Sequence, residues 1–454
     1  MKINNIEKIT FWFLALLIIF IFSYNIINYD ASSGYDGEAH HGYVDHVAMH
    51  LPREVNLPTV EDTREYFNPP VAYIFPSVVK VLCRNIIDSE DFYRNCQPIY
   101  KQLSQIFQSF LFFISLLFYM KIFQLIKGFK SISNLNVLLV IGLLTINYRA
   151  FLMIRGEPYI ILFSSIMLYR FLLLLENNLE YSKKDYLIFG LLIALLGLSR
   201  QWAFLLFPGF FICIFFFDSR EKKIKLFKFL ASSFIVGFFG CSWFYFKHLI
   251  DYGSFFAFNM STMPFNFSNQ PKSFYLPNLE SIRLVFQKPI RPNFLNQYIP
   301  IVYSDLWGDY WGYFSFTRDA LETGRNQNLI GDYLARVNIF SLVPSLIFLS
   351  SFMSKIKIFK SKNKNKYDHF YIYIIFSIVI TFLGNIWFVI KHPTLLSGDT
   401  IKAIYLLQGF HMIGILTISY LEDLKEKSFN RYILFVCMLL AVFIHNFSAM
   451  LTHY

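Results

Sequence analysis

The stretch TFWFLALLIIFIFSYNIIN, residues 10–28, decides the fold class of this chain. It is apolar over nearly the length of about 20 residues that a helix needs to cross a bilayer. Asn4 and Lys8 precede the stretch, and no small-residue cleavage site follows it. We therefore predict an uncleaved first membrane span rather than a signal peptide.

Comparable apolar runs recur along the rest of the chain. Hydrophobic residues make up 55% of the sequence and charged residues only 16%, against about 25% charged residues in a typical soluble domain. The further runs lie at 103–126, 134–150, 157–176, 186–199, 201–217, 229–249, 336–353, 369–390, 400–419 and 432–451. The sequence predicts an all-α, polytopic helix bundle with about eleven spans, forming one integral membrane domain over residues 1–454.

The basic residues predict the orientation of this bundle. The net charge is +11, and Lys and Arg concentrate in alternate short loops near 121–130, 183–184, 220–228, 355–366 and 425–431. This placement indicates membrane topology and gives no reason to expect nucleic-acid binding. By the positive-inside rule, the N-terminus is cytoplasmic and the C-terminal Tyr454 lies outside. Two long segments, 29–102 and 250–335, then fall on the extracytoplasmic side, where we expect folded caps.

Five cysteines are present, and none belongs to a CxxC pair. This argues against a zinc or redox motif. Cys83 and Cys96 both fall in the first extracytoplasmic segment, where an oxidising compartment would permit a disulfide between them. The sequence alone does not decide whether that bond forms.

The first extracytoplasmic segment contains YDGEAHHGYVDH, residues 35–46. If it is helical, Asp36, His40, Tyr43 and Val47 share one face at i, i+4, i+7 and i+11. One interpretation is a general base held near a lipid-borne substrate, because a carboxylate can take a proton from an attacking hydroxyl. The other is a solvated helix that happens to be rich in acids.

The same segment raises the question of a metal. Four histidines occur with Asp36 and Asp45, and His46 and His50 have the i, i+4 spacing that zinc ligands can use. No H-E-x-x-H pattern is present, so we predict no structural zinc and assign no metal ligands. A divalent cation held by carboxylates remains an open alternative.

The segment ends in EYFNPPVAY, residues 65–73. Its two prolines impose an extended approach and favour a helix that starts just after them. The chain either makes a simple turn back to the membrane here or places Glu65 and Tyr66 in the same cavity as Asp36.

Taken together, these patterns resemble the GT-C class of membrane glycosyltransferases, and within it the bacterial family 39 and mannosyltransferase-like members. Asp36, His40 and Tyr43 match a D-x-x-x-H-x-x-Y pattern after the first span. Leu51-Pro52 matches a Leu-Pro that often follows, and Glu65 with residues 69–73 matches an acid near a Pro-Pro-hydrophobic-x-Tyr turn.

Further elements of the resemblance follow in order along the chain. Arg155-Gly156-Glu157-Pro158 opens a span, Ser199-Arg200-Gln201 forms a polar break, and residues 305–312 resemble a Trp-rich outer loop. Residues 399–408 resemble a G-R-Y-L-x-P element. They depart from it because Lys402 stands ahead of Ala403-Ile404, where the element has Arg directly before Tyr405, and because Gln408 replaces the proline.

The resemblance implies an inverting transfer of a sugar from a polyprenyl-phosphate carrier to a glycan, lipid or protein acceptor at the outer face of a cell membrane. It makes Asp36 the catalytic base, with Glu38 as the alternative. The leaving phosphate needs cations or amide donors, although basic residues at helix ends can equally contact lipid headgroups. The substrate-binding residues that we predict are His40, Tyr43, Glu65, Tyr66, Arg155, Glu157, Arg200, Lys391, Lys402 and Tyr405. No organic cofactor is expected.

Two other classes of function compete with this one. A transporter or flippase of lipid-linked sugars would be expected to show paired half-sequences with broken helices near the midplane. We find no such internal symmetry, and the acids cluster in a loop rather than in the spans. A non-catalytic assembly protein of the cell envelope is the third hypothesis, and such a protein would tolerate the loss of Asp36.

Overall fold

The structure, a computed structural model, describes residues 5–452 apart from 33–35, 87–91, 129–131, 261, 290–293, 295, 309–326, 362–363 and 394–399. The described residues form helices and contain no strand. The helices of the first half are α1 (Asn5–Asn28), α2 (Gly37–His50), α3 (Val71–Ile86), α4 (Phe92–Lys127), α5 (Ile132–Gly142), α6 (Ile146–Ala150), α7 (Glu157–Glu176), α8 (Lys183–Gly197), η1 (Gln201–Leu206) and α9 (Pro208–Ile214). Those of the second half are α10 (Arg220–Tyr252), η2 (Phe267–Asn269), α11 (Lys272–Tyr275), α12 (Leu279–Val285), α14 (Tyr298–Trp307), α16 (Gln327–Phe340), α17 (Leu342–Ile356), η4 (Lys357–Lys360), α18 (Lys366–Lys391), η5 (Ala403–Leu406), α19 (Leu407–Lys427), α20 (Phe429–Asn446) and η6 (Phe447–Met450).

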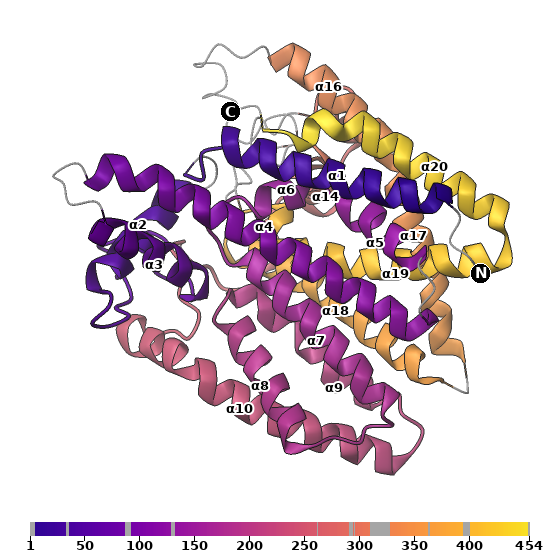
Figure 1. Cartoon of the computed structure of the whole chain (residues 1–454), viewed down its shortest axis with the longest axis horizontal. Coiled ribbons are helices and arrows are strands. Elements are labelled where there is room, and N and C mark those ends of the chain that lie inside the picture. Colours follow the sequence, from indigo (N-terminus) through magenta and orange to yellow (C-terminus); the bar gives the residue numbers. More distant parts are fainter. Residues whose placement is uncertain are drawn as a thin grey trace.

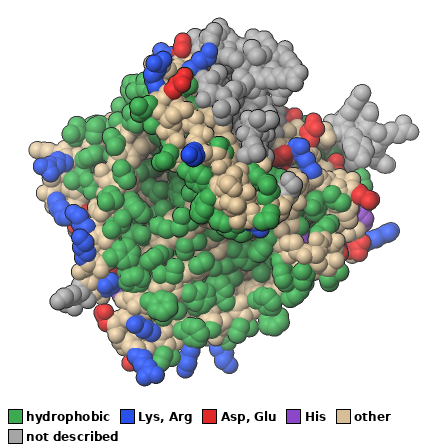
Figure 2. All heavy atoms as spheres, turned by 180° about the vertical axis from the view of Figure 1, so that it is seen from behind, with side chains coloured by type: hydrophobic (Ala, Val, Ile, Leu, Met, Phe, Trp, Pro, Cys, Tyr) green, Lys and Arg blue, Asp and Glu red, His purple; other side chains and the backbone are tan. Residues whose placement is uncertain are grey.

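Eight helical stretches of the described chain are long and apolar enough to cross a membrane. They are Asn5–Asn28, Cys96–Lys127, Glu157–Glu176, Arg220–Tyr252, Gly331–Lys360, Lys366–Lys391, Ala403–Lys427 and Phe429–Met450. The chain is therefore a multi-pass helical membrane protein, as the hydropathy predicts. Figure 2 shows a wide belt of hydrophobic side chains between two ends that carry the charged ones, as lipid contact requires.

The predicted count of about eleven spans is not confirmed, because three of the apolar runs form shorter helices. The run 134–150 is split into α5 and α6, 186–199 becomes the 15-residue α8, and 201–217 becomes η1 and α9. A helix of 15 residues extends about 22 Å, less than the hydrocarbon core of about 30 Å. At the split between α5 and α6, the side chains of Asn147 and Tyr148 donate hydrogen bonds to the backbone carbonyl oxygens of Ile141 and Gly142.

The long helices lie side by side, with the N-terminus at one end of the bundle and the helices α2 and α3 at the opposite end (Figure 1). The short α8 packs closely along the long α10. A Cβ at Gly190 of α8 would lie 2.6 Å from the Val236 Cβ of α10, and one at Gly237 would lie 2.4 Å from Ile193. Close contact over small residues is how helices associate in lipid, where the hydrophobic effect does not drive them together.

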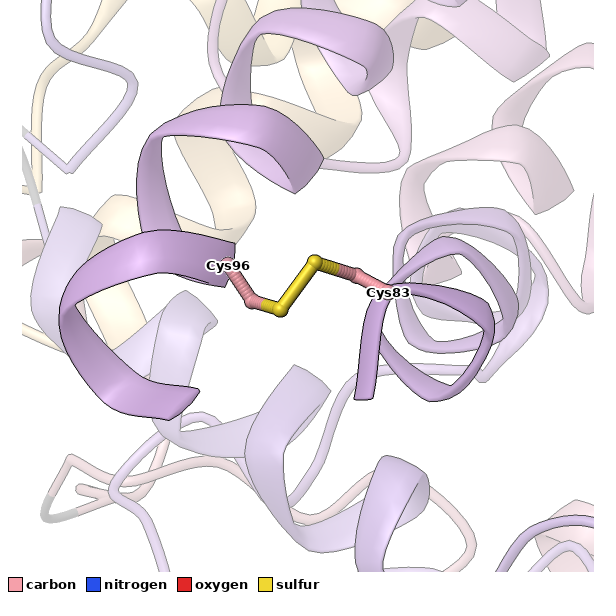
Figure 3. The surroundings of a disulfide bond; sticks show 2 residues. All are labelled: Cys83 and Cys96. Atoms are coloured by element: carbon pink, nitrogen blue, oxygen red, sulfur yellow. A yellow bond between two sulfur atoms is a disulfide. The ribbon is translucent and has the colours of Figure 1, made fainter. Parts of the chain in front are cut away.

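The segment after α1, which the sequence predicts to be extracytoplasmic, folds into α2 and α3, and a disulfide joins α3 to the bundle. The helix considered for residues 35–46 is present and spans Gly37–His50, with His40, Tyr43 and Val47 on its buried face. Asp36 precedes the helix in a left-handed conformation, so it does not share that face as a helical residue. Tyr43 stacks on Tyr73 of α3 with ring centroids 3.8 Å apart. Cys83 near the end of α3 bonds to Cys96 near the start of α4, so the disulfide that the sequence left open is present (Figure 3). It fixes α3 to the first turns of a spanning helix.

Candidate active site

One cavity of about 170 Å³ lies where the N-terminus of α2 meets several breaks in the bundle. The break between α8 and η1, the loop after α10, the end of α18 and the start of η5 all contribute to its wall. The residues that line it are Asp36, Glu65, Phe67, Asn68, Arg200, Gln201, Trp202, Phe258, Asn259, Met260, Phe388, Thr400, Lys402 and Tyr405. The cavity is therefore built from segments that are far apart in the sequence.

Asp36 lies immediately before α2 and lines this cavity. Its backbone has φ 57° and ψ 17°, the left-handed conformation, which Asp tolerates better than most residues. The next residue must be glycine, because a Cβ at Gly37 would lie 2.0 Å from the Ser32 carbonyl oxygen. A non-glycine residue held in this sparsely populated conformation is typical of functional positions.

The carboxylate of Asp36 is surrounded by cations. An Arg64 nitrogen lies 2.7 Å from one oxygen, and Lys402 Nζ lies 3.6 Å from the other. Burial acts to raise the pKa of Asp36, but the positive charges of Lys402 and Arg64, with those of Arg155 and Arg200, outweigh it and lower the pKa. Asp36 is therefore ionised at neutral pH, as a general base must be.

Beside Asp36, the cavity wall contains a buried network around Arg200. The guanidinium donates to Asn68 Oδ1, and Asn68 donates in turn to the Glu65 carboxylate. Arg200 Nε lies 3.3 Å from Glu157 Oε1, and another Arg200 nitrogen lies 3.9 Å from Glu65 Oε2. These charges are almost fully buried, so each must be compensated by its neighbours. Two carboxylates therefore hold Arg200 in place at the cavity.

A single glycine allows this network to form. Gly156 precedes α7, and a Cβ at this position would lie 2.0 Å from the carbonyl oxygen of Ser199. Only glycine lets the break after α8 come this close to the start of α7. The approach brings Arg200 beside Glu157, which explains the glycine immediately before Glu157.

His40 lies behind this wall and is held in one tautomer. Its Nε2 is 3.3 Å from an Arg155 nitrogen, and because arginine only donates, Nε2 must accept. The proton is then on Nδ1, which donates to Tyr73 Oη at 2.7 Å. Burial, followed by the charges of Arg155 and Arg200, lowers the pKa of His40 far below its ordinary value. His40 is therefore neutral and positions its neighbours.

Glu65 differs from Asp36 in its electrostatics. Burial raises the pKa of Glu65 above its ordinary value, although Arg200 and Asn68 oppose that effect. The described residues at and behind the cavity include four cations, Arg64, Arg155, Arg200 and Lys402, and four acids, Asp36, Glu65, Glu157 and Asp305. The cations and the carboxyl groups are thus equal in number, and most of these charges are paired within the site.

Lys402 is the residue immediately before η5, and its backbone is extended. Its side chain lines the cavity. The carboxylate of Asp305 in α14 accepts a hydrogen bond of 2.6 Å from the backbone N–H of Ala403. Lys402 Nζ lies 5.9 Å from the ring centroid of Tyr405, one turn further on. Asp305 thereby fixes the backbone that presents the ammonium group.

Aromatic side chains form the remaining wall. The Trp202 ring lies 4.5 Å from Phe388, 5.0 Å from Tyr405 and 6.2 Å from Phe258, measured between centroids. Gln201 donates to the carbonyl oxygens of Phe67 and Ala257, which fixes the loop after α10 against this wall. Aromatic walls with a few oriented polar groups are typical of small-molecule sites.

The predicted site residues divide into three sets. Asp36, Glu65, Arg200, Lys402 and Tyr405 line the cavity. His40, Tyr43, Arg155 and Glu157 are buried behind it. Glu38, Tyr66 and Lys391 do not line it.

The three residues outside the cavity have other environments. Glu38 is exposed, and Tyr66 packs on Tyr252 with its hydroxyl 3.4 Å from the Phe258 carbonyl oxygen. Lys391 lies over the ring of Trp387 at the end of α18. The Trp-rich element predicted at 305–312 is described only as far as Gly308, and Asp399 lies outside the described residues.

Sequence reasoning missed Arg64 as the partner of Asp36. It also missed nine residues that line the cavity: Phe67, Asn68, Gln201, Trp202, Phe258, Asn259, Met260, Phe388 and Thr400. Asn68 stands inside the quoted EYFNPPVAY stretch, so its polarity next to two prolines could have marked it. Phe258 to Met260 carry no local signal, because their role depends on how the loop after α10 folds back.

No three His, Cys, Asp or Glu side chains come together as a metal site within the described chain. A divalent cation held by carboxylates, the alternative that the sequence left open, has no assigned ligands. In comparisons with known proteins, no family model and no curated protein matches this chain. The fold and the site define the class of the protein as a multi-pass helical membrane protein with a cavity at one end of its bundle that contains both carboxylates and cations.

Proposed function

We propose that the protein is an inverting glycosyltransferase that moves a sugar from a polyprenyl-phosphate carrier to an acceptor on the outer face of the membrane. The observation that carries the proposal is the presence, in one cavity, of an ionised Asp36 together with the buried cations Arg200 and Lys402. The motif resemblance along the chain supports the same assignment.

In this reaction the acceptor hydroxyl attacks the anomeric carbon. Asp36 takes the hydroxyl proton as the new carbon–oxygen bond forms, and the bond from the anomeric carbon to the phosphate oxygen breaks. The electron pair leaves with the polyprenyl phosphate, whose negative charge increases. Lys402 and Arg200 stabilise that added charge, because preorganised cations in a water-poor site act most strongly where charge develops. A single displacement of this kind inverts the anomeric configuration.

The remaining wall suits a sugar. Trp202, Phe258 and Tyr405 offer apolar faces to the C–H side of a pyranose ring, and Asn68 and Gln201 add amide groups. Glu65 and Glu157 keep Arg200 oriented rather than acting on substrate. Glu38 is exposed and outside the cavity, so Asp36 is the better assignment for the base.

The outer-face location is supported by two independent features. The basic loops predict that the end of the bundle bearing α2 and α3 is extracytoplasmic. The Cys83–Cys96 disulfide lies at this same end, and disulfides persist in oxidising compartments. We therefore place the C-terminus and the active site outside and the N-terminus in the cytoplasm of a cell that carries the protein in its cell membrane.

A transfer assay tests the proposal against the two competing functions. Purified protein in lipid nanodiscs is incubated with a radiolabelled polyprenyl-phosphate sugar and a panel of glycan, lipid and peptide acceptors. A glycosyltransferase releases free polyprenyl phosphate and yields a product of inverted anomeric configuration. A flippase would instead move the intact donor between leaflets of proteoliposomes without cleaving it. An assembly protein would do neither.

A further inference from the structure

Asp36 lies between two cations that differ greatly in their exposure. Its Oδ1 is 2.7 Å from an Arg64 nitrogen and its Oδ2 is 3.6 Å from Lys402 Nζ, so each carboxylate oxygen has its own cation. The side chain of Lys402 is 9% exposed, whereas that of Arg64 is 60% exposed. Asp36 and Lys402 line the cavity, and Arg64 lies outside that lining. Arg64 therefore covers Asp36 from the water side, and Lys402 contacts it from within the cavity.

The backbone at Arg64 is anchored on both sides. Thr63, just before it, is buried, and its hydroxyl donates to the Ala39 carbonyl oxygen of α2 at 2.6 Å. Glu65, just after it, is almost fully buried beside the cavity, and its backbone N–H donates to the Thr63 hydroxyl at 3.3 Å. The contact with Asp36 can therefore open by rotation of the arginine side chain alone. Opening it costs little, because an ion pair with an exposed partner is weak.

The other two members of this contact have much less freedom. Asp36 is in the left-handed conformation, and Gly37 after it packs so closely against the preceding turn that a Cβ would not fit. Lys402 is held through its neighbour, since Asp305 accepts a hydrogen bond from the backbone N–H of Ala403. The outer arginine is thus the mobile member of the three.

This difference assigns separate roles to the two oxygens of Asp36. A general base needs an oxygen within hydrogen-bond reach of the proton that it takes. Oδ1 becomes accessible when Arg64 turns away, whereas Oδ2 stays beside Lys402, the cation that we assign to the leaving phosphate. An open Oδ1 can also take a proton from water, and attack by that water loses the donor sugar through hydrolysis.

We propose that Arg64 is a specificity-determining residue that keeps Asp36 from activating water until an acceptor displaces it, an inference that rests on the proposed function. The acceptor arrives from the water side, takes the place of the guanidinium at Oδ1 and presents its hydroxyl there. With Arg64 turned away and only water present, the water oxygen attacks the anomeric carbon as Asp36 takes one of its protons. The bond from that carbon to the phosphate oxygen breaks, and the products are the free sugar and polyprenyl phosphate.

The ratio of hydrolysis to transfer tests this role. Wild-type and variant proteins in nanodiscs receive a labelled polyprenyl-phosphate sugar, with and without an acceptor, and both the free sugar and the transferred sugar are counted. We expect Arg64→Gln to raise the ratio of free to transferred sugar by about ten-fold, a part of the 10²–10⁴-fold that general-base catalysis contributes. Arg64→Lys keeps the positive charge and should stay close to the wild-type ratio. An unchanged ratio in Arg64→Gln would overturn the proposal.

Two further variants separate this role from a merely structural one. Arg53→Gln makes the same change at an exposed arginine of the same segment, and it should keep the wild-type ratio at an equal thermal midpoint. Arg64→Gln combined with Asp36→Asn should lose the extra hydrolysis, because Asp36 is the group that activates the water. Extra hydrolysis that persists in the double variant, or that Arg53→Gln also shows, would contradict the assignment.

The two proposals fail in different ways. If the wild-type protein transfers sugar and Arg64→Gln hydrolyses no more donor than it does, the assignment of Arg64 is wrong and the glycosyltransferase stands. If neither protein cleaves the donor with any acceptor or with water, the glycosyltransferase is wrong and the assignment of Arg64 falls with it.

Discussion

Lys402 Nζ lies 3.6 Å from Oδ2 of Asp36, so the base and a cation that we assign to the phosphate are direct neighbours. Before substrate binds, the ammonium group stabilises the carboxylate and weakens it as a base. A phosphate that binds Lys402 offsets this charge and makes Asp36 more basic. Donor binding would thereby activate the base, which limits proton abstraction to the complex in which a sugar is present.

The role of Lys402 can be tested by removing the ammonium group. We expect Lys402→Ala to lower kcat/KM for the donor by about 10²-fold, because a cation that stabilises the leaving phosphate is lost. The apparent KM for the acceptor should change much less. Steady-state kinetics with each substrate varied in turn measure both effects. Equal losses for donor and acceptor would count against the phosphate role.

The pH dependence of the reaction follows from the electrostatics at Asp36. Because the surrounding cations lower its pKa, kcat/KM should stay level through neutral pH and fall only below about pH 4, the ordinary range of an Asp carboxyl. Lys402→Met removes the largest opposing charge, so the pKa of Asp36 should rise and the acidic limb should move to higher pH. Activity profiles of the two proteins between pH 3 and pH 8 check the direction. An unchanged limb would contradict the pairing.

The buried pair of Arg200 and Glu157 predicts a stability effect. Removing one partner of a buried ion pair typically costs about 3–5 kcal/mol, because the other charge stays buried without compensation. We expect Glu157→Gln and Arg200→Met each to lower the thermal midpoint in detergent. The double variant should lose less than the sum of the two, as expected for residues in direct contact. Simple additivity would show that the two charges do not interact.

The disulfide between Cys83 and Cys96 can be tested by counting the free thiols of the protein. Of the five cysteines, only Cys213, Cys241 and Cys437 should react with a maleimide in unfolded, unreduced protein. Closing a loop of this size contributes about 3 kcal/mol in the chain-entropy treatment, so Cys83→Ser paired with Cys96→Ser should reduce the thermal stability of the α2–α3 cap. Mass spectrometry of alkylated peptides reads the count directly. Five reactive thiols would contradict the bond.

The fold class was predictable because long apolar runs carry an unambiguous signal. The runs that do not form full-length spans are short or broken: 186–199 forms only the 15-residue α8, 201–217 divides at Pro208, and 134–150 divides before Asn147. Asn147 in α6 donates to the Ile141 carbonyl oxygen of α5 across the split, and Arg200 lies in the break between α8 and η1, so these segments form short helices that hydrophobicity alone does not distinguish from full spans. The break at Arg200 nevertheless indicated the site, since a charge inside an apolar stretch is costly unless it serves a function.

The candidate site was predictable only in part, for a physical reason. His40, Tyr43 and Val47 follow the helical repeat, so their common burial could be deduced from spacing. Lys391 and Tyr66 had the right chemistry and the expected end of the bundle, but packing turned them onto Trp387 and Tyr252. Phe258 lines the cavity because the loop after α10 packs back against the bundle. No local sequence pattern predicts that long-range contact.

The most direct measurement of the central claim compares Asp36→Asn with Glu61→Gln, a matched change at an exposed acid of the same segment. Both variants are purified, checked for equal thermal midpoints and assayed for sugar release from a labelled polyprenyl-phosphate donor. General-base catalysis contributes about 10²–10⁴-fold, so Asp36→Asn should lose at least that much turnover while Glu61→Gln keeps the wild-type rate. Wild-type turnover by a folded Asp36→Asn protein would contradict the account.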